Sequence, residues 1–217
     1  QRTEQLEGFA SLVSHDVRNP LNVAQGYVEL LAERTDDPAV DEIDESLDRI
    51  ETIVADILAL SRGERELDLA PTALESVVAD AWASVDTPNA TLEIGGEHPG
   101  GDGLPRVQAD GSQLQRVFEN LFRNSIEHGM PAENPRLTVT VSYADGVLTV
   151  EDDGVGFPDG RVESLFELGE TGSGGGTGIG LAIVEGLIEQ HGWSVTAEKC
   201  DECGGARFRI AGIDPLP

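Results

Sequence analysis

Residues 152–157 read DDGVGF and directly follow residues 147–151, in which apolar and polar side chains alternate. The alternation predicts a β-strand, so a motif of the form D-x-G-x-G lies at a strand end. A carboxylate there can accept a hydrogen bond, and the glycines allow a flat ring to approach the backbone. The arrangement suits an acceptor for the exocyclic amine of adenine.

A second glycine-rich stretch occupies residues 172–180 and is followed at once by a predicted apolar helix from about Leu181 to Gln190. Backbone N–H groups at the start of such a helix point toward an anion, and the helix dipole adds to the attraction. A flexible linker is also rich in glycine, but an apolar helix seldom follows a linker directly. The P-loop pattern and the dinucleotide fingerprint do not fit, because no Lys-Ser/Thr pair follows the glycines and the spacing from the preceding strand differs.

Two asparagines share one face of a helix that we expect between Asp110 and Gly129. Asp110 and Gln113 have the spacing of a capping box, which predicts the start of this helix. Asn120 and Asn124 are four residues apart, so their carboxamides lie on the same side. Neutral oxygen ligands suit a magnesium ion that keeps most of its charge for substrate phosphates, although solvent-exposed asparagines can have the same spacing.

The first 62 residues have a helical pattern that breaks at residues 35–38. Apolar side chains recur at intervals of three and four on both sides of the break, which predicts two long amphipathic helices in an antiparallel hairpin. A two-helix hairpin cannot cover its own apolar stripe. A four-helix bundle formed by dimerisation is therefore the simplest arrangement.

The first of these helices contains the sequence SHDVRNPL at residues 14–21. Asp16 can orient the imidazole of His15 so that its second nitrogen acts as a nucleophile. Asn19 lies four residues from His15, on the same face of the helix. Taken alone, a helical histidine beside an aspartate is more often a solvated surface pair.

After residue 63 the pattern changes to a mixture of helical and alternating segments. The turn signal Asp145-Gly146 predicts a β-hairpin. The expected fold is an α-helical hairpin that forms a dimeric four-helix bundle, residues 1–66, followed by an α+β two-layer sandwich, residues 67–217. The further elements predicted for the second domain are a helix near 74–85 and strands at 137–143, 147–151, 194–198 and 206–210.

The composition is strongly acidic, because 41 Asp and Glu residues against 14 Lys and Arg residues give a formal net charge of -27 over 217 residues. Nucleic acids and anionic membrane surfaces are disfavoured partners, since they carry charge of the same sign. Lys199 is the only lysine. Such an excess of acid in a sequence with clear apolar periodicity favours a folded protein of a halophilic organism, because the Debye length is only about 3 Å at 1 M salt; an ordinary acidic surface is the alternative.

The sequence has no run of about 18 apolar residues, so no membrane span is predicted. Residues 1–7 are polar and do not resemble a signal peptide. We therefore expect a soluble, cytoplasmic segment without membrane contact.

The two cysteines, Cys200 and Cys203, form a single C-x-x-C pattern. A closed zinc site normally has four Cys or His ligands. A turn that carries two thiols is therefore favoured over a redox or metal site.

Together these segments resemble the catalytic core of a two-component sensor histidine kinase, and the resemblance covers nearly the whole chain. It implies that residues 68–213 form the ATP-binding sandwich that this family shares with gyrase and mismatch-repair ATPases. Six short motifs follow the family's order: a phosphoacceptor box at 9–21, an asparagine box at 113–124, a first glycine box at 153–156, a phenylalanine box at 166–167, a second glycine box at 176–180 and a terminal glycine motif at 204–208.

The resemblance implies that His15 accepts the γ-phosphoryl group of ATP and passes it to an aspartate on a response-regulator receiver domain. Asp16 would be the base that activates His15. Asn19 would help to place water for dephosphorylating the receiver, which would add a phosphatase activity. The chain would act as a homodimer through residues 1–66, with ATP and Mg²⁺ as its cofactors.

The resemblance also implies a nucleotide site. Asn124 would be the principal magnesium ligand with Asn120 beside it, and Asp153 would bind adenine. Arg123 is the nearest obvious cation to the expected phosphates. The other implied nucleotide-site residues are Gly154, Gly156, Gly176, Thr177, Gly178, Gly180 and Leu181, with residues 167–176 as a mobile lid.

The chain departs from the family pattern in its basic residues. Glu127 and His128 stand where many relatives have a cation, and residues 167–176 contain no Lys or Arg. A non-catalytic module that binds nucleotide or a receiver is therefore the alternative function. A gyrase-type ATPase is disfavoured, because it would have a glutamate in place of Asn120 and leaves the motif around His15 unexplained.

Overall fold

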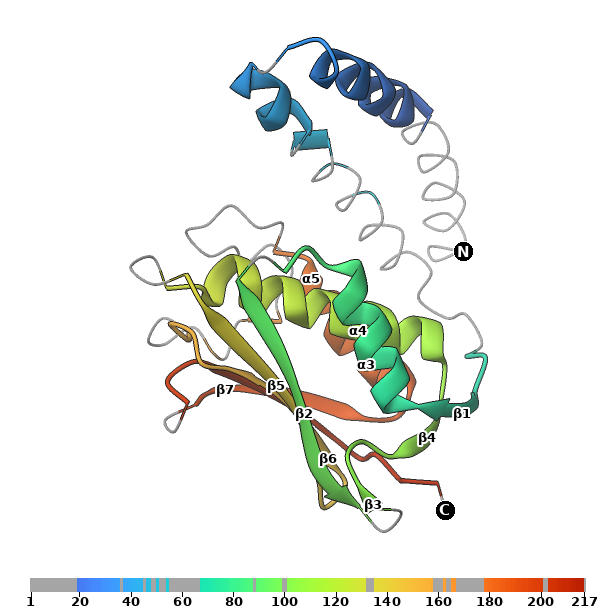
Figure 1. Ribbon diagram of the computed structural model, residues 1–217. Helices are drawn as coiled ribbons and strands as arrows, with labels where there is room; N and C mark the ends of the chain where they lie inside the picture. The colour runs from blue at the N-terminus through green and yellow to red at the C-terminus, as the bar shows by residue number, and fades with distance from the viewer. Residues whose placement is uncertain are drawn as a thin grey trace. The chain divides into compact units, whose positions relative to one another are not determined.

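Figure 1 shows the computed structural model of the chain, which divides into two compact units, residues 1–65 and 66–217. The structure describes residues 19–35, 37–44, 46–47, 50, 54, 67–87, 89–98, 101–131, 135–157, 162, 165–166, 178–200 and 203–216.

The first unit contains two helical segments, residues 19–32 and 38–44, separated by a turn at 33–35. The second segment begins at Pro38, and the preceding Asp37 side chain accepts a hydrogen bond from the Ala39 N–H (3.1 Å). An aspartate cap and a proline in the first turn are both typical of a helix start. The predicted break between two helices is confirmed within the described residues.

Many apolar side chains of this unit are exposed. Leu21, Val28 and Val40 are buried, but other large apolar side chains of this unit are not. None of the described helices is both long enough and apolar enough to cross a membrane. The large exposed apolar side chains among the described residues of this unit are Val23, Tyr27, Leu30, Leu31, Ile43 and Ile50.

The second unit is built on a six-stranded sheet of order β3-β2-β5-β6-β8-β7. β2 and β5 run parallel, and the other neighbouring strands run antiparallel. A separate antiparallel ladder joins β1 and β4. The elements in chain order are β1 (Ala70–Ala73), α3 (Leu74–Ser84), β2 (Ala90–His98), β3 (Gly101–Asp102), β4 (Arg106–Ala109), α4 (Gly111–Asn124), the π-helical segment η1 (Ser125–Gly129), β5 (Leu137–Ala144), β6 (Val147–Asp152), α5 (Gly180–Gln190), β7 (Ser194–Lys199) and β8 (Ala206–Ala211).

Helices α3, α4 and α5 cover one face of the sheet, and α4 contacts both of the others (Figure 1). The rings of Phe118 and Phe122 on α4 stack 6.0 Å apart, and Trp82 on α3 meets Phe122 edge-on at 5.1 Å. Both phenylalanines are fully buried, and burial of such a side chain contributes about 1.5–3 kcal/mol. The predicted two-layer α+β sandwich is confirmed.

Side chains of the central strands alternate between the helix-covered inner face and the uncovered outer face. Leu148, Val150 and Asp152 on β6 are buried on the inner face, whereas the residues between them are only half-buried. β8 follows the same rule, with Phe208 buried and Arg209 exposed. The period of two therefore decides which side chains of a strand reach the core.

Helix α4 begins where the sequence predicts it. Asp110 accepts hydrogen bonds from the N–H groups of Ser112 (3.1 Å) and Gln113 (3.2 Å). The reciprocal half of a capping box is not formed, because the Asp110 N–H donates to His191 Nε2 instead (3.1 Å). The helix continues to Gly129 as expected, but its last five residues form the wider π-helical segment η1.

The predicted β-hairpins are also confirmed. Asp145 and Gly146 have φ angles of 50° and 81° between β5 and β6, which are the positive values that a two-residue type I′ turn requires. β7 pairs with β8 over the predicted residues. Four strands, β1 to β4, were not predicted: β2 contains Gly95-Gly96, which interrupt its apolar pattern, and β3 has only two residues.

Candidate functional site

Asp152, the last residue of β6, is a buried carboxylate with only 2% of its surface exposed. Its Oδ1 accepts hydrogen bonds from the Gly154 and Ala206 N–H groups (both 3.1 Å), and its Oδ2 accepts one from the Ser125 hydroxyl (2.8 Å). Burial raises the pKa of Asp152, these hydrogen bonds oppose the rise, and the charge of Asp153 adds to it. An ionised carboxylate has about four acceptor sites, so Asp152 can accept one more hydrogen bond from a ligand.

Asp153 has a different environment. Its side chain is exposed, and its Oδ1 accepts a hydrogen bond from the Thr138 N–H (2.6 Å), while its own N–H donates to the Thr138 carbonyl (3.2 Å). Asp153 therefore links the end of β6 to β5, and both of these hydrogen bonds go to Thr138 and not to the groups that hold Asp152. The geometry favours Asp152 over Asp153 as the acceptor that the D-x-G-x-G motif supplies. The signal was present in the sequence, because the alternation along β6 places Asp152 on the inner face.

Backbone segments approach one another so closely beside Asp152 that only glycine fits. A Cβ atom on Gly154 would overlap the carbonyl group of Gly129, and one on Gly205 would overlap the backbone and side-chain oxygens of Asp152. The Val155 N–H also donates to the Gly129 carbonyl (2.9 Å). η1, the turn after β6 and the β7–β8 turn are thus packed into one wall next to the carboxylate.

The two asparagines of α4 lie near this wall. Asn120 is largely buried, its Nδ2 donates to the Arg116 carbonyl (2.9 Å), and a Cβ on Gly180 would lie only 2.8 Å from its Oδ1. Asn124 Nδ2 is buried without a hydrogen-bond partner among the described residues. Arg123, between them in sequence, is half-buried.

The Asn124 amide fits a ligand site. A buried polar group left without a partner costs about 1–3 kcal/mol, which a bound ligand or ion would offset. The nitrogen and oxygen of an amide are assigned from their partners, so this group can equally present its oxygen. Two amide oxygens on one helix face are suitable ligands for magnesium.

The start of α5 completes the arrangement. The helix begins at Gly180 after Ile179, whose side chain forms no capping hydrogen bond. The first-turn N–H groups of a helix, here including that of the half-buried Leu181, have no acceptor within the helix itself, which makes a helix start suited to bind an anion. Gly178 and Gly156 have positive φ angles of 64° and 68°, which glycine adopts without strain.

A single helical segment, α4 with η1, connects these parts. Asn120 faces the start of α5, Ser125 holds Asp152, and Gly129 packs against Gly154. Carboxylate, amides, glycine turns and helix start therefore meet at one end of the inner face. Ser125 and Gly129 were not singled out from the sequence, because their partners follow more than 20 residues later and no local pattern marks them.

Other predicted site residues cannot be placed. His15, Asp16, Gly176, Thr177 and the lid at 167–176 lie outside the described residues. Asn19 is described, and it is an exposed helical residue of the first unit.

The prediction for the cysteines needs a correction. Cys200 and Cys203 form a disulfide with their Cα atoms 5.4 Å apart, not a turn with two free thiols. The short C-x-x-C spacing at the end of β7 places the two sulfur atoms within bonding reach.

Comparison with known protein families matches two segments of the chain. Residues 5–66 match the His Kinase A (phospho-acceptor) domain, and residues 109–214 match the family described as Histidine kinase-, DNA gyrase B-, and HSP90-like ATPase.

Curated relatives are similar along most of the chain. Sensor histidine kinase ZraS of Salmonella typhi is 32% identical over 225 residues, which cover 97% of this chain and 47% of ZraS. Sensor protein FixL of Bradyrhizobium diazoefficiens is 32% identical over 219 residues, with coverage of 93% and 42%. The chain spans about half the length of the curated relatives it matches.

Solved structures of similar fold include full-length ShkA in complex with AMPPNP, with a TM-score of 0.71 and 27% identity over 98% of this chain and 46% of that one. Histidine kinase ThkA in complex with response regulator protein TrrA has a TM-score of 0.60 at 24% identity, over 96% of this chain and 62% of that one, which shows similarity of fold.

Proposed function

The chain is the catalytic core of a sensor histidine kinase, and we propose that it phosphorylates His15 with ATP and passes the phosphoryl group to an aspartate of a response-regulator receiver domain. The observation that carries the proposal is the buried Asp152, held by neutral donors and joined through α4 to the Asn120 and Asn124 amides. The family match over residues 5–66 supports the phosphoacceptor part.

Adenine binding follows from the chemistry around Asp152. Its remaining acceptor site suits the exocyclic amine of adenine, and the close-packed glycine turns form the wall beside this acceptor. Guanine has a carbonyl oxygen at the equivalent position, which a carboxylate would repel. The site therefore selects adenine over guanine nucleotides.

The phosphates would lie toward α4 and α5. Asn124 and Asn120 would hold the magnesium ion, which supplies charge neutralisation and orientation of the phosphates when bound. Arg123 and the first-turn N–H groups of α5 would bind phosphate oxygens, with Gly176 and Thr177 extending this loop. The Asn124 Nδ2, buried without a hydrogen-bond partner among the described residues, supports this assignment.

In the transfer step, His15 Nε2 attacks the γ-phosphorus while the bond to the bridging oxygen of ADP breaks. Asp16 accepts the hydrogen bond of the Nδ1 proton, which orients the ring and stabilises its positive charge. Asn19 would position water for removing the phosphoryl group from the receiver aspartate, and its exposure on the helix supports access to a partner.

A homodimer through residues 1–66 is part of the proposal. The exposed side chains of Tyr27, Leu30 and Ile43 support it, because a second copy of the hairpin would cover such apolar surface in a four-helix bundle. Because the reaction consumes ATP, the proposal assigns it to the cytoplasm.

Adaptation to strong salt is also proposed, on the basis of the net charge of -27. High salt would screen repulsion between the protein and the phosphates. Affinity for ATP should then rise with KCl concentration, and a monotonic fall would count against the idea.

The proposed function is tested by incubating the chain with γ-labelled ATP and Mg²⁺. Acid-labile, base-stable label is expected on the protein, lost in His15→Ala and retained in His98→Ala, a control histidine on β2 outside all the motifs. ATP binding without label in the unmodified chain would contradict kinase activity and favour a non-catalytic module.

A further inference from the structure

The Cys200–Cys203 disulfide joins the end of β7 to the β7–β8 turn. Cys200 is fully buried, whereas Cys203 is half-exposed. The Cys203 N–H lies 3.0 Å from Cys200 Sγ. Cys203 is therefore the cysteine that a small reagent would reach first, and the buried Cys200 lies within disulfide-bonding distance of it.

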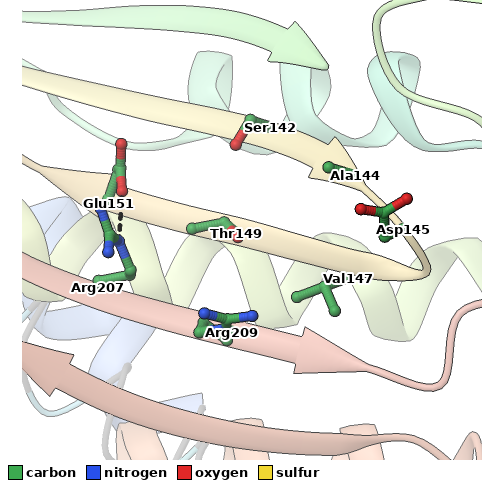
Figure 2. A pocket seen from close by; sticks show the side chains of 8 residues that line it. All are labelled: Ser142, Ala144, Asp145, Val147, Thr149, Glu151, Arg207 and Arg209. Carbon is green, nitrogen blue, oxygen red and sulfur yellow. Dashed lines mark hydrogen bonds and ion pairs between the residues drawn. The ribbon is translucent and has the colours of Figure 1, made fainter. Parts of the chain in front are cut away.

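The pair lies beside charged groups of the outer face. Arg207 donates to Cys200 Sγ through Nη2 (3.2 Å) and to Glu151 Oε2 through Nε (2.6 Å). Glu151 and Arg207 belong to the residues that line a hollow of about 350 Å³ on this face, and Figure 2 shows them joined at one end of that group. A guanidinium at this distance favours the thiolate form of a reduced cysteine.

The position of Arg207 argues against a metal site. A carboxylate oxygen of Glu151 and the two sulfur atoms lie within 4.8 Å of one another, which resembles part of a ligand set. The guanidinium already occupies the Glu151 carboxylate and contacts Cys200 Sγ. The Arg207 guanidinium would repel a divalent cation at this position. The cluster is therefore better suited to thiol–disulfide exchange than to metal binding.

The disulfide is connected to Asp152 through the turn. The Cys200 N–H donates to the Gly205 carbonyl (2.9 Å), and the Gly204 N–H donates to the Cys200 carbonyl (2.7 Å). Gly205 packs against Asp152, and the next residue, Ala206, donates its N–H to Asp152 Oδ1. A covalent constraint on this turn thus acts on the wall of the nucleotide site.

We propose that Cys200 and Cys203 are a dithiol–disulfide pair that exchanges with small-molecule disulfides and thiols, and that its redox state sets the ATP affinity of the neighbouring site. The inference rests on the proposed function of that site. The closed disulfide holds the Gly205 turn against Asp152, so the oxidised chain binds ATP more tightly than the reduced chain.

The chemistry balances without a further reactant. The Cys203 thiolate attacks a small disulfide and releases one small thiol, which leaves a mixed disulfide on Cys203. The Cys200 thiolate then attacks the Cys203 sulfur and releases the second small thiol. The two cysteines lose two electrons to the reagent, and their protons pass to the released thiolates.

The test uses the whole chain after treatment with oxidised glutathione or with reduced dithiothreitol. Thiol titration should count no free thiols in the oxidised sample and two in the reduced sample. Affinity for a fluorescent ATP analogue should fall about five-fold on reduction, which corresponds to about 1 kcal/mol. The double variant Cys200→Ser/Cys203→Ser should show one affinity in both conditions.

A second readout tests the contact with Arg207. Closure of the mixed disulfide by the Cys200 thiolate, followed as release of the second small thiol, should slow at least three-fold in Arg207→Gln, and should be unchanged in the matched control Arg209→Gln on the same strand and face. Equal rates in all three proteins would overturn the role of Arg207.

The outcomes separate the two proposals. Equal ATP affinity in both redox states, with thiol counts that change as expected, would overturn the regulation and leave the kinase function intact. A change of affinity that persists in the double serine variant would overturn it as well. Absence of ATP binding in both states would contradict the proposed function itself, and with it the regulation.

Discussion

Two neighbouring carboxylates lie on the inner and outer faces of the six-stranded sheet, and they differ in burial and in the charge of their partners. Glu151 on the outer face is 24% exposed and is neutralised by Arg207 at 2.6 Å. Asp152 on the inner face is buried, and its described partners are neutral N–H and O–H donors. Two adjacent residues of β6 therefore differ in role. Glu151 forms a structural ion pair, whereas Asp152 is a hydrogen-bond acceptor with a raised pKa, which is suited to bind a ligand.

The largest difference between the two faces should be in the stability lost on substitution of two neighbouring residues of β8, Phe208 and Arg209. Phe208→Ala removes a buried side chain that meets Phe157 at 5.6 Å, and should lower the free energy of unfolding by about 3–5 kcal/mol. Arg209→Ala, on the exposed face, should change it by less than about 0.5 kcal/mol. Tryptophan fluorescence in urea measures this selectively, because both tryptophans, Trp82 and Trp193, belong to the second unit. Similar losses in both variants would show that the two faces are equally packed.

The next contrast is in ligand affinity. Asp152→Asn replaces an acceptor by a group that also donates, and should weaken ATP binding about 30-fold, or about 2 kcal/mol. Asp153→Asn is the matched control and should stay within about two-fold. Displacement of a fluorescent ATP analogue provides the measurement. The reverse order of effects would restore Asp153 as the adenine acceptor.

The buried Asp152 should also affect how the stability of the protein changes with pH. Because folding raises the pKa of Asp152 above its ordinary value of 3.8, mainly through burial, the native state binds more protons than the unfolded state between these two pKa values. The contribution of Asp152 to stability is therefore full below the lower pKa and is lost as pH rises through the higher one. The loss amounts to about 1.36 kcal/mol for each pH unit that separates the two pKa values.

Comparison with Asp152→Asn isolates this contribution. The stability of the variant relative to the unmodified chain should increase between about pH 4 and neutral pH. The pKa of Asp110 is lowered, because its hydrogen bonds outweigh the effect of burial. Its contribution to stability therefore changes with pH in the opposite direction. This contribution is the same in both proteins, so it cancels when their stabilities are subtracted. A flat difference curve would contradict a raised pKa at Asp152.

The smallest effect should come from the outer carboxylate. Glu151→Gln removes the partially exposed ion pair with Arg207 and should cost about 0.5–1 kcal/mol in low salt. The loss should shrink in about 1 M KCl, where the Debye length is about 3 Å. Urea unfolding at both salt concentrations measures it, and a loss that does not depend on salt would indicate packing in place of charge.

Local signals were sufficient for much of the fold. The Asp145-Gly146 turn and the Asp110 cap lie within a few residues of the groups they organise, so the sequence predicts them directly. Strand β2 was missed because it is paired by residues far along the chain and its glycines interrupt the apolar pattern. Long-range pairing of this kind leaves little trace in a short segment.

The candidate site could be predicted in its residue types but only partly in its geometry. The asparagine pair and the glycine turns were identified from their spacing. The choice between Asp152 and Asp153 depended on which face of β6 each occupies, a question that the strand alternation answers but the glycine motif does not. The hydrogen bond from the Ser125 hydroxyl to Asp152 joins η1 to strand β6, which follows more than 20 residues later. Such a contact can be identified only from the folded structure.

The parallel pairing of β2 with β5 also has a consequence for the order of folding. It joins residue 90 to residue 137, and α4 and η1 lie within the chain between them. Closing so long a loop costs more entropy than forming the β5–β6 or β7–β8 hairpins, so we expect the hairpins to form early and β2 to dock late. The helix that carries both asparagines is then enclosed in a loop that closes late, and ATP binding should begin only after this loop has closed.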